Sequence, residues 1–124
     1  DVQVVFTDFQ GIGEWDWVHH YSGNMEDLKT AQCIPSVMAL CDARVRDVYG
    51  NFKSDVHYED AEWWLNLYLN RKCNFKHIPE PLCYYRRTTG SRIDILDQKQ
   101  KEGFEQLNNM FKDFGVKYES SLCV

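Results

Sequence analysis

The segment from His57 to Leu69 constrains the fold most, because it carries the strongest helical pattern in the chain. At roughly 100° per residue, Asp60 falls on the apolar side of this helix, together with Trp63, Trp64 and Leu67. The polar strip comprises Glu59, Glu62, Asn66 and Asn70. First-turn N–H groups and the helix dipole favour an anion at this position. We therefore expect a helix over about residues 59–72, with one carboxylate on its buried or cleft-facing side.

Composition limits the classes of function that the chain can have. Its 124 residues suffice for a single domain, 1–124, with a real core. The net charge is -5 and the sequence holds no basic stripe, which argues against nucleic acid as a partner. No apolar run reaches the length of a transmembrane helix.

The cysteines are odd in number and widely spaced, and the sequence has no CxxC pair. This pattern predicts reduced, partly buried thiols in a cytoplasmic protein, and it disfavours a zinc site. His19 and His20 are adjacent, so on an extended chain they point to opposite faces and do not easily share one metal ion. The cysteines are Cys33, Cys41, Cys73, Cys83 and Cys123.

The order of elements predicts an α/β fold with a mixed sheet flanked by helices. Strands are expected at 2–9 and 34–41, with a hairpin strand at 14–18. A short helix should follow Asn24, and a second should start after Asp42 and end at Gly50. Several connections are too short for parallel crossovers, so the sheet must be mixed.

The region after the central helix leaves two alternatives open. Residues 74–78 and 82–88 are strand-like, and Pro79 and Pro81 lie between them. The two segments form either a tight antiparallel pair or one strand that bends at the prolines. Alternation along the second segment places Leu82, Tyr84 and Arg86 on one face and Cys83, Tyr85 and Arg87 on the other. A long C-terminal helix is expected over residues 94–114.

The order and spacing of several segments resemble the C-terminal, acceptor-binding half of a family 2 glycosyltransferase of the GT-A fold. An acidic pair opens a helix with tryptophans, a Pro-Glu-Pro-Leu strand with Tyr-Arg follows, and Ser91 comes shortly after. Val2 to Asp8 is similar to the family's valine-rich strand that ends in Asp, and residues 36–50 resemble its next strand and helix. The likeness covers roughly residues 1–92. The two main segments read Glu59-Asp60-Ala61-Glu62-Trp63-Trp64-Leu65 and Phe75-Lys76-His77-Ile78-Pro79-Glu80-Pro81-Leu82-Cys83-Tyr84-Tyr85-Arg86-Arg87.

The resemblance implies an inverting sugar transfer from a nucleotide-sugar to a hydroxyl acceptor, such as a carbohydrate or lipid-linked acceptor in cell-surface polysaccharide synthesis. It assigns the general base to Asp60, whereas a simple helix cap is the alternative. Glu59 is a substrate-binding candidate or a solvated first-turn carboxylate. Trp63 and Trp64 are candidates for a wall against a sugar ring, or core residues. Arg86 and Arg87 are candidates for contacts with the diphosphate or the acceptor, or partners in ion pairs.

The chain departs from this family in lacking the half that binds the nucleotide and the metal. Glu14-Trp15-Asp16 is not at the position of the family's metal motif. We therefore expect a fragment with no cofactor of its own, whose parent binds Mg²⁺ or Mn²⁺ through a motif outside this chain. Alone it should be inactive and self-associate, and membrane association of the parent would come through the missing parts. The alternative is a non-catalytic binding or structural module that keeps half of the GT-A fold.

Overall fold

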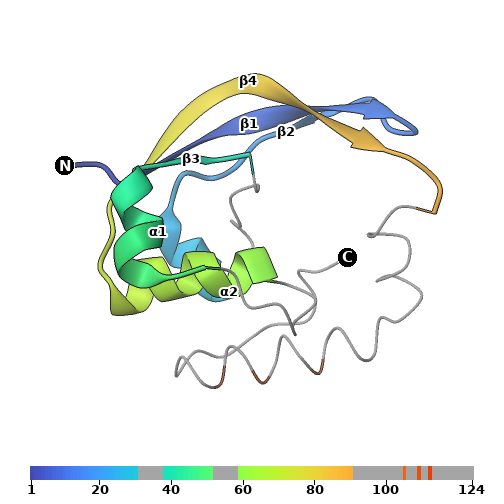
Figure 1. Ribbon diagram of the computed structural model, residues 1–124. Helices are drawn as coiled ribbons and strands as arrows, with labels where there is room; N and C mark the ends of the chain where they lie inside the picture. Colours follow the sequence, from blue (N-terminus) through green and yellow to red (C-terminus); the bar gives the residue numbers. More distant parts are fainter. Residues whose placement is uncertain (31–37, 52–58, 91–104, 106–108, 110–111, 113–124) are drawn as a thin grey trace.

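The structure is a computed structural model that describes residues 1–30, 38–51 and 59–90, together with the single residues 105, 109 and 112. Within these ranges the chain forms a mixed α/β unit in which a four-stranded sheet lies over short helices (Figure 1). The predicted helix over residues 94–114 lies outside the described residues, except that Glu105, Asn109 and Lys112 are helical. None of the described helices is long and apolar enough to cross a membrane.

Strand β1 (Val4–Gly13) is the centre of the sheet, because every other strand pairs with it. The long strand β4 (Phe75–Arg87) runs parallel to β1. Two short strands, β2 (Val18–His19) and β3 (Leu40–Cys41), pair antiparallel with opposite ends of β1. The mixed sheet is thus confirmed. The hairpin partner of β1 lies at Val18–His19 rather than at the expected 14–18. β1 continues through Gly11 to Gly13, beyond the end expected at residue 9.

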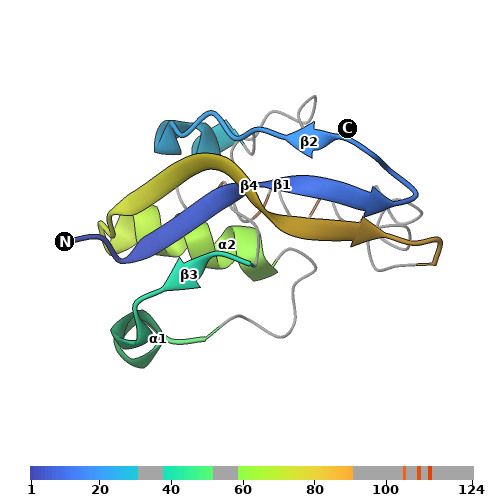
Figure 2. The ribbon, with the colours of Figure 1, turned by 90° about the horizontal axis from the view of Figure 1, so that it is seen from above.

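Strand β4 is a single strand with an irregularity, so the bent-strand alternative is confirmed. The β1–β4 register shifts on both sides of Asp8, which is paired with Pro81. Pro79 and Pro81 have no N–H group, so a regular ladder cannot continue through them. Figure 2 shows that β4 crosses β1 at an angle. At the end of β1 where β3 pairs, β4 and β3 lie on opposite sides of β1, and at the other end β4 and β2 lie on opposite sides.

The short helices begin where the sequence predicts caps. The 3₁₀ helix η1 (Met25–Thr30) follows Asn24, whose side chain accepts the Glu26 N–H at 3.2 Å. Helix α1 (Ala43–Tyr49) begins at Asp42, which accepts the Arg44 N–H at 2.9 Å. Gly50 ends α1 with a φ of 89°, which is a left-handed conformation that favours glycine.

The central helix is shorter than predicted and is not amphipathic. Helix α2 (Glu59–Leu65) is followed by a π-helical segment, η2 (Asn66–Asn70). The expected placement of Glu62 on a solvated strip is wrong, since its side chain is only 8% exposed. Residues 61–65 are all buried, so this helix is enclosed on every side beneath the sheet (Figure 1).

The hydrophobic core lies between α2 and the N-terminal half of the sheet. Residues from both helices, η1, η2 and β1 meet there, and Trp64 and Phe75 pack edge to face at 5.9 Å. The cysteines at 41, 73 and 83 are thiols, as predicted, while Cys33 and Cys123 lie outside the described residues. The core comprises Val4, Leu28, Val45, Trp63, Trp64, Leu65, Leu67 and Cys73.

Two glycines with nearly equal φ offer a matched test of the strand ends. Gly13 has φ 83° and Gly90 has φ 80°, but a Cβ on Gly13 would overlap the Arg87 carbonyl oxygen, whereas a Cβ on Gly90 meets nothing within 4 Å. We expect Gly90→Ala to lower the free energy of unfolding by about 1 kcal/mol through the left-handed backbone alone. Gly13→Ala should lower the free energy of unfolding by clearly more, because the added methyl group would also force β1 away from β4. Urea denaturation measures both, and equal losses would contradict the packing at Gly13.

Candidate functional site

Asp60, the predicted catalytic carboxylate, lies in the first turn of α2. Asp60 is partly buried, and its side chain accepts the Ala61 N–H at 2.9 Å. Burial raises the pKa of Tyr85, and the negative charge of Asp60 raises it further, against the opposing effect of Arg87. Asp60 and Tyr85 are distant in sequence, yet in the folded chain the charge of Asp60 acts on the Tyr85 hydroxyl.

The two arginines of strand β4 lie on opposite faces of the strand. Leu82 and Tyr84 are 61% and 71% exposed, and Arg86 is exposed as well. Tyr85 and Arg87 are partly buried on the other face, so the predicted alternation is confirmed. The Arg87 guanidinium carbon lies 5.6 Å from the centre of the Trp15 ring. Of the two arginines, Arg87 is therefore the one on the same face as Tyr85.

Both tryptophans that were candidates for a sugar wall are in the core. Trp63 is 7% exposed and Trp64 is 1% exposed, and their rings meet at 4.9 Å. The Trp63 indole N–H donates to the Gly50 carbonyl oxygen at 3.1 Å. This placement agrees with the core interpretation. Glu59 starts α2, and its side chain is outside what the structure describes.

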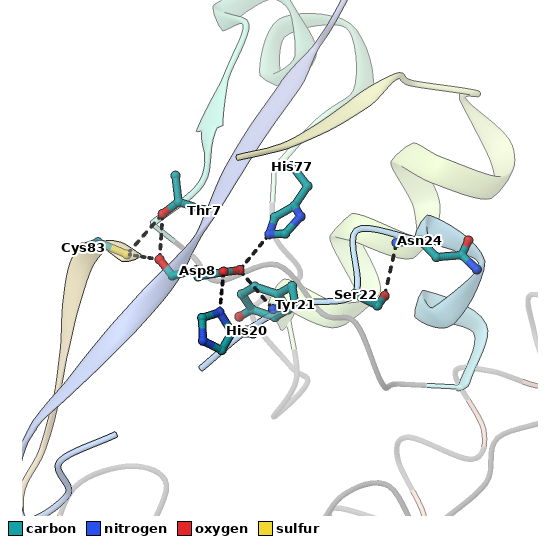
Figure 3. Close-up of polar contacts among 8 residues, drawn as sticks. All are labelled: Thr7, Asp8, His20, Tyr21, Ser22, Asn24, His77 and Cys83. Carbon is teal, nitrogen blue, oxygen red and sulfur yellow. Dashed lines mark hydrogen bonds and ion pairs between the residues drawn. The ribbon is translucent and has the colours of Figure 1, made fainter. Parts of the chain in front are cut away.

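A second polar cluster, centred on Asp8, lies where β4 crosses β1 (Figure 3). Asp8 is 1% exposed, and one carboxylate oxygen accepts the Tyr21 N–H at 3.0 Å. The same oxygen lies 2.7 Å from Nε2 of His77, and the other lies 2.9 Å from Nδ1 of His20. Three groups from two different segments therefore converge on one buried carboxylate.

The environment of Asp8 favours its ionised form. Burial raises the pKa of this carboxyl, but the Tyr21 N–H and the two imidazoles outweigh burial and lower it. The His77 side chain is 12% exposed and the His20 side chain is 70% exposed. The cluster thus has one buried and one solvent-facing imidazole on the same carboxylate.

Neighbouring groups hold this cluster in place. Phe6 stacks on the His77 ring at 5.0 Å with an interplanar angle of 24°. A Cβ on Gly23 would come within 2.9 Å of Nδ1 of His77, so glycine allows the close approach. The Asp8 carbonyl oxygen accepts the Thr7 hydroxyl at 2.8 Å and the Cys83 thiol at 3.5 Å (Figure 3). Side chains therefore satisfy a carbonyl group at the irregularity in the ladder.

The Asp8 cluster was not predicted from the sequence. Asp8 and His77 are 69 residues apart, and only the parallel pairing of β1 with β4 joins them. The available signal was a single carboxylate in an otherwise apolar strand. His19 and His20 have different environments, as predicted: His20 contacts Asp8, while His19 stacks on Phe9 at 4.9 Å. Among the described residues no group of His, Cys, Asp and Glu could hold a metal ion.

Comparisons with protein-family models, with curated proteins and with solved structures find no match to this chain.

Replacing Asp8 tests whether its charge stabilises the strand crossing. We expect Asp8→Asn to lower the free energy of unfolding by about 2 to 4 kcal/mol at pH 7, because a buried charge with charge-assisted hydrogen bonds is lost. The folded pKa of Asp8 is below its unfolded value, so this stabilisation is complete above the unfolded pKa. It disappears as the pH falls through the folded pKa.

Urea denaturation of the two proteins between pH 6 and the acid limit of folding measures this difference. Asp47→Asn is a suitable control, because Asp47 is exposed and pairs only at the surface with Arg46, at 3.3 Å. A gap between Asp8→Asn and wild type that stays constant down to the lowest pH would rule out a contribution of the Asp8 charge.

Proposed function

We propose that this chain is the acceptor-binding half of an inverting family 2 glycosyltransferase, with Asp60 as general base. The observation that supports it is the electrostatic effect of the Asp60 charge on Tyr85, because both residues belong to segments that carry the family resemblance. A shared acceptor site would draw on both segments.

In the proposed reaction the Asp60 carboxylate takes the proton of an acceptor hydroxyl. The acceptor oxygen forms a bond to the anomeric carbon of the nucleotide-sugar, and the bond from that carbon to the diphosphate oxygen breaks. The nucleoside diphosphate leaves with the electron pair, and the configuration at the anomeric carbon inverts. General-base assistance of this kind contributes about 10²- to 10⁴-fold to a rate.

The neighbours of Asp60 suit a hydroxyl-bearing substrate. Tyr85 keeps its proton at neutral pH, because burial and Asp60 raise its pKa, and it can donate a hydrogen bond. Arg87 brings a cation to the same face and could pair with a phosphate oxygen or with the acceptor. In this proposal the nucleotide and Mg²⁺ or Mn²⁺ are bound by the donor half, outside this chain.

A non-catalytic module is the second candidate, and one contact favours it. The Asp60 side chain accepts the N–H of the next residue, Ala61, at 2.9 Å, as a local structural role would require. Under this alternative Asp60 stabilises the start of α2, and the enclosed α2 is a packing element.

Asp60→Asn distinguishes the two candidates in a protein that joins this chain to a donor-binding half. We expect kcat for sugar transfer to fall about 10²- to 10⁴-fold with little change in the acceptor KM, because the amide cannot accept the proton. Asp47→Asn, on the exposed side of α1, should leave both constants unchanged. Near-normal turnover of Asp60→Asn, in a protein that unfolds at the wild-type urea concentration, would exclude the base and favour the module.

A further inference from the structure

The face of the sheet that carries Tyr85 also carries a continuous group of aromatic rings. Alternation along the hairpin places the odd-numbered residues 15 to 21 on one side. They surround Phe9, which is 6% exposed, and Tyr85 closes the group at 5.2 Å from Phe9. We call this group the aromatic face; it consists of Phe9, Trp15, Trp17, His19, Tyr21 and Tyr85.

Packing fixes the rings of the aromatic face before any ligand binds. The Trp15 indole N–H donates to the Tyr85 carbonyl oxygen at 2.8 Å. A Cβ on Gly11 would come within 2.7 Å of the Trp15 ring, so this glycine lets the indole lie on the strand. Trp17 then packs edge to face against Trp15 at 5.1 Å. A surface held in this way binds a ligand with little loss of side-chain entropy.

Trp17 is the member of the aromatic face that is most open to a ligand. Its side chain is 43% exposed, although Phe9, Trp15 and His19 all contact it. Within the described part of the chain its indole N–H has no hydrogen-bond partner. An exposed indole with an unused donor combines a flat apolar surface with a polar edge.

The aromatic face is uncharged at neutral pH. Burial is the largest effect on His19 and lowers its pKa; together with a smaller contribution from His20 it outweighs the opposing charge of Asp8. Tyr85 keeps its proton for the reasons given above. The nearby charges are opposite in sign, Asp60 and Arg87, so neither an anion nor a cation is favoured as the ligand. A neutral ring with apolar C–H groups and many hydroxyls fits these surroundings.

We infer that the aromatic face binds a sugar ring of an oligosaccharide acceptor, with Trp17 stacked on that ring. This inference rests on the proposed transferase function, because it places the ring beside the sugar that Asp60 would deprotonate. Phe9 and Trp15 separate Trp17 from Tyr85, so Trp17 reaches a unit beyond the reacting one. The aromatic face, rather than the buried Trp63 and Trp64, then supplies the sugar platform.

Calorimetric titration of the 124-residue chain with cellotetraose, maltotetraose and chitotetraose tests the inference without a donor. At least one tetrasaccharide should bind the wild type with a Kd below about 10 mM. Trp17→Ala should weaken that binding by about tenfold or more, because an exposed stacking surface is lost. Trp17→Phe should retain most of the affinity, since a smaller ring still stacks.

Tyr84→Ala is the control, because Tyr84 is an even more accessible aromatic side chain, 71% exposed, on the opposite face of β4. Its affinity should equal that of the wild type. Absence of binding by all three tetrasaccharides, an unchanged affinity in Trp17→Ala, or an equal loss in Tyr84→Ala would overturn the inference.

The inference and the proposed function can fail separately. Loss of tetrasaccharide binding in Trp17→Ala, together with normal transfer by Asp60→Asn, would leave the sugar site standing and remove the base. Loss of transfer in Asp60→Asn, together with full tetrasaccharide affinity in Trp17→Ala, would support Asp60 as the base and remove the sugar site.

Discussion

The buried carboxylate of Asp8 is the interaction on which the rest of the structure depends. An isolated charge in a protein interior costs several kcal/mol, so it is stable only with partners. Here the partners are the Tyr21 N–H and the imidazoles of His20 and His77, which come from the chain after β1 and from β4. The hydrogen bonds to this one carboxylate hold β4 and the segment after β2 against the middle of β1.

The strand crossing at Asp8 divides the sheet into two parts with different environments. Before the crossing, Val4 of β1 and Phe75 of β4 pack against the tryptophans of α2 and complete the core. Beyond it, Phe9 and Tyr85 carry the aromatic face, where Trp17 remains accessible. Because the register of β4 changes at the prolines, one strand can contribute to both environments.

The proposed site uses the second of these parts. Asp60 lies in the first turn of α2, a helix whose following residues, 61–65, are buried. Its charge acts on Tyr85, which belongs to a strand that Asp8 and His77 fix at the crossing. Under the proposed function, the Asp60 carboxylate would activate the acceptor hydroxyl and the aromatic face would stack on a sugar ring.

The sequence by itself determined the features that depend on local chemistry. Asp42 and Gly50 bound α1, and alternation assigned the faces of Tyr84 and Tyr85, because caps, left-handed turns and the period of a strand act over a few residues. Only the tertiary structure decided that β4 is one bent strand, that α2 is enclosed and that Asp8 meets His77. These features depend on contacts between distant segments. A buried charge or a buried helix face is stable only when residues far away in the sequence pack against it or form hydrogen bonds with it, and no local pattern shows which residues these are.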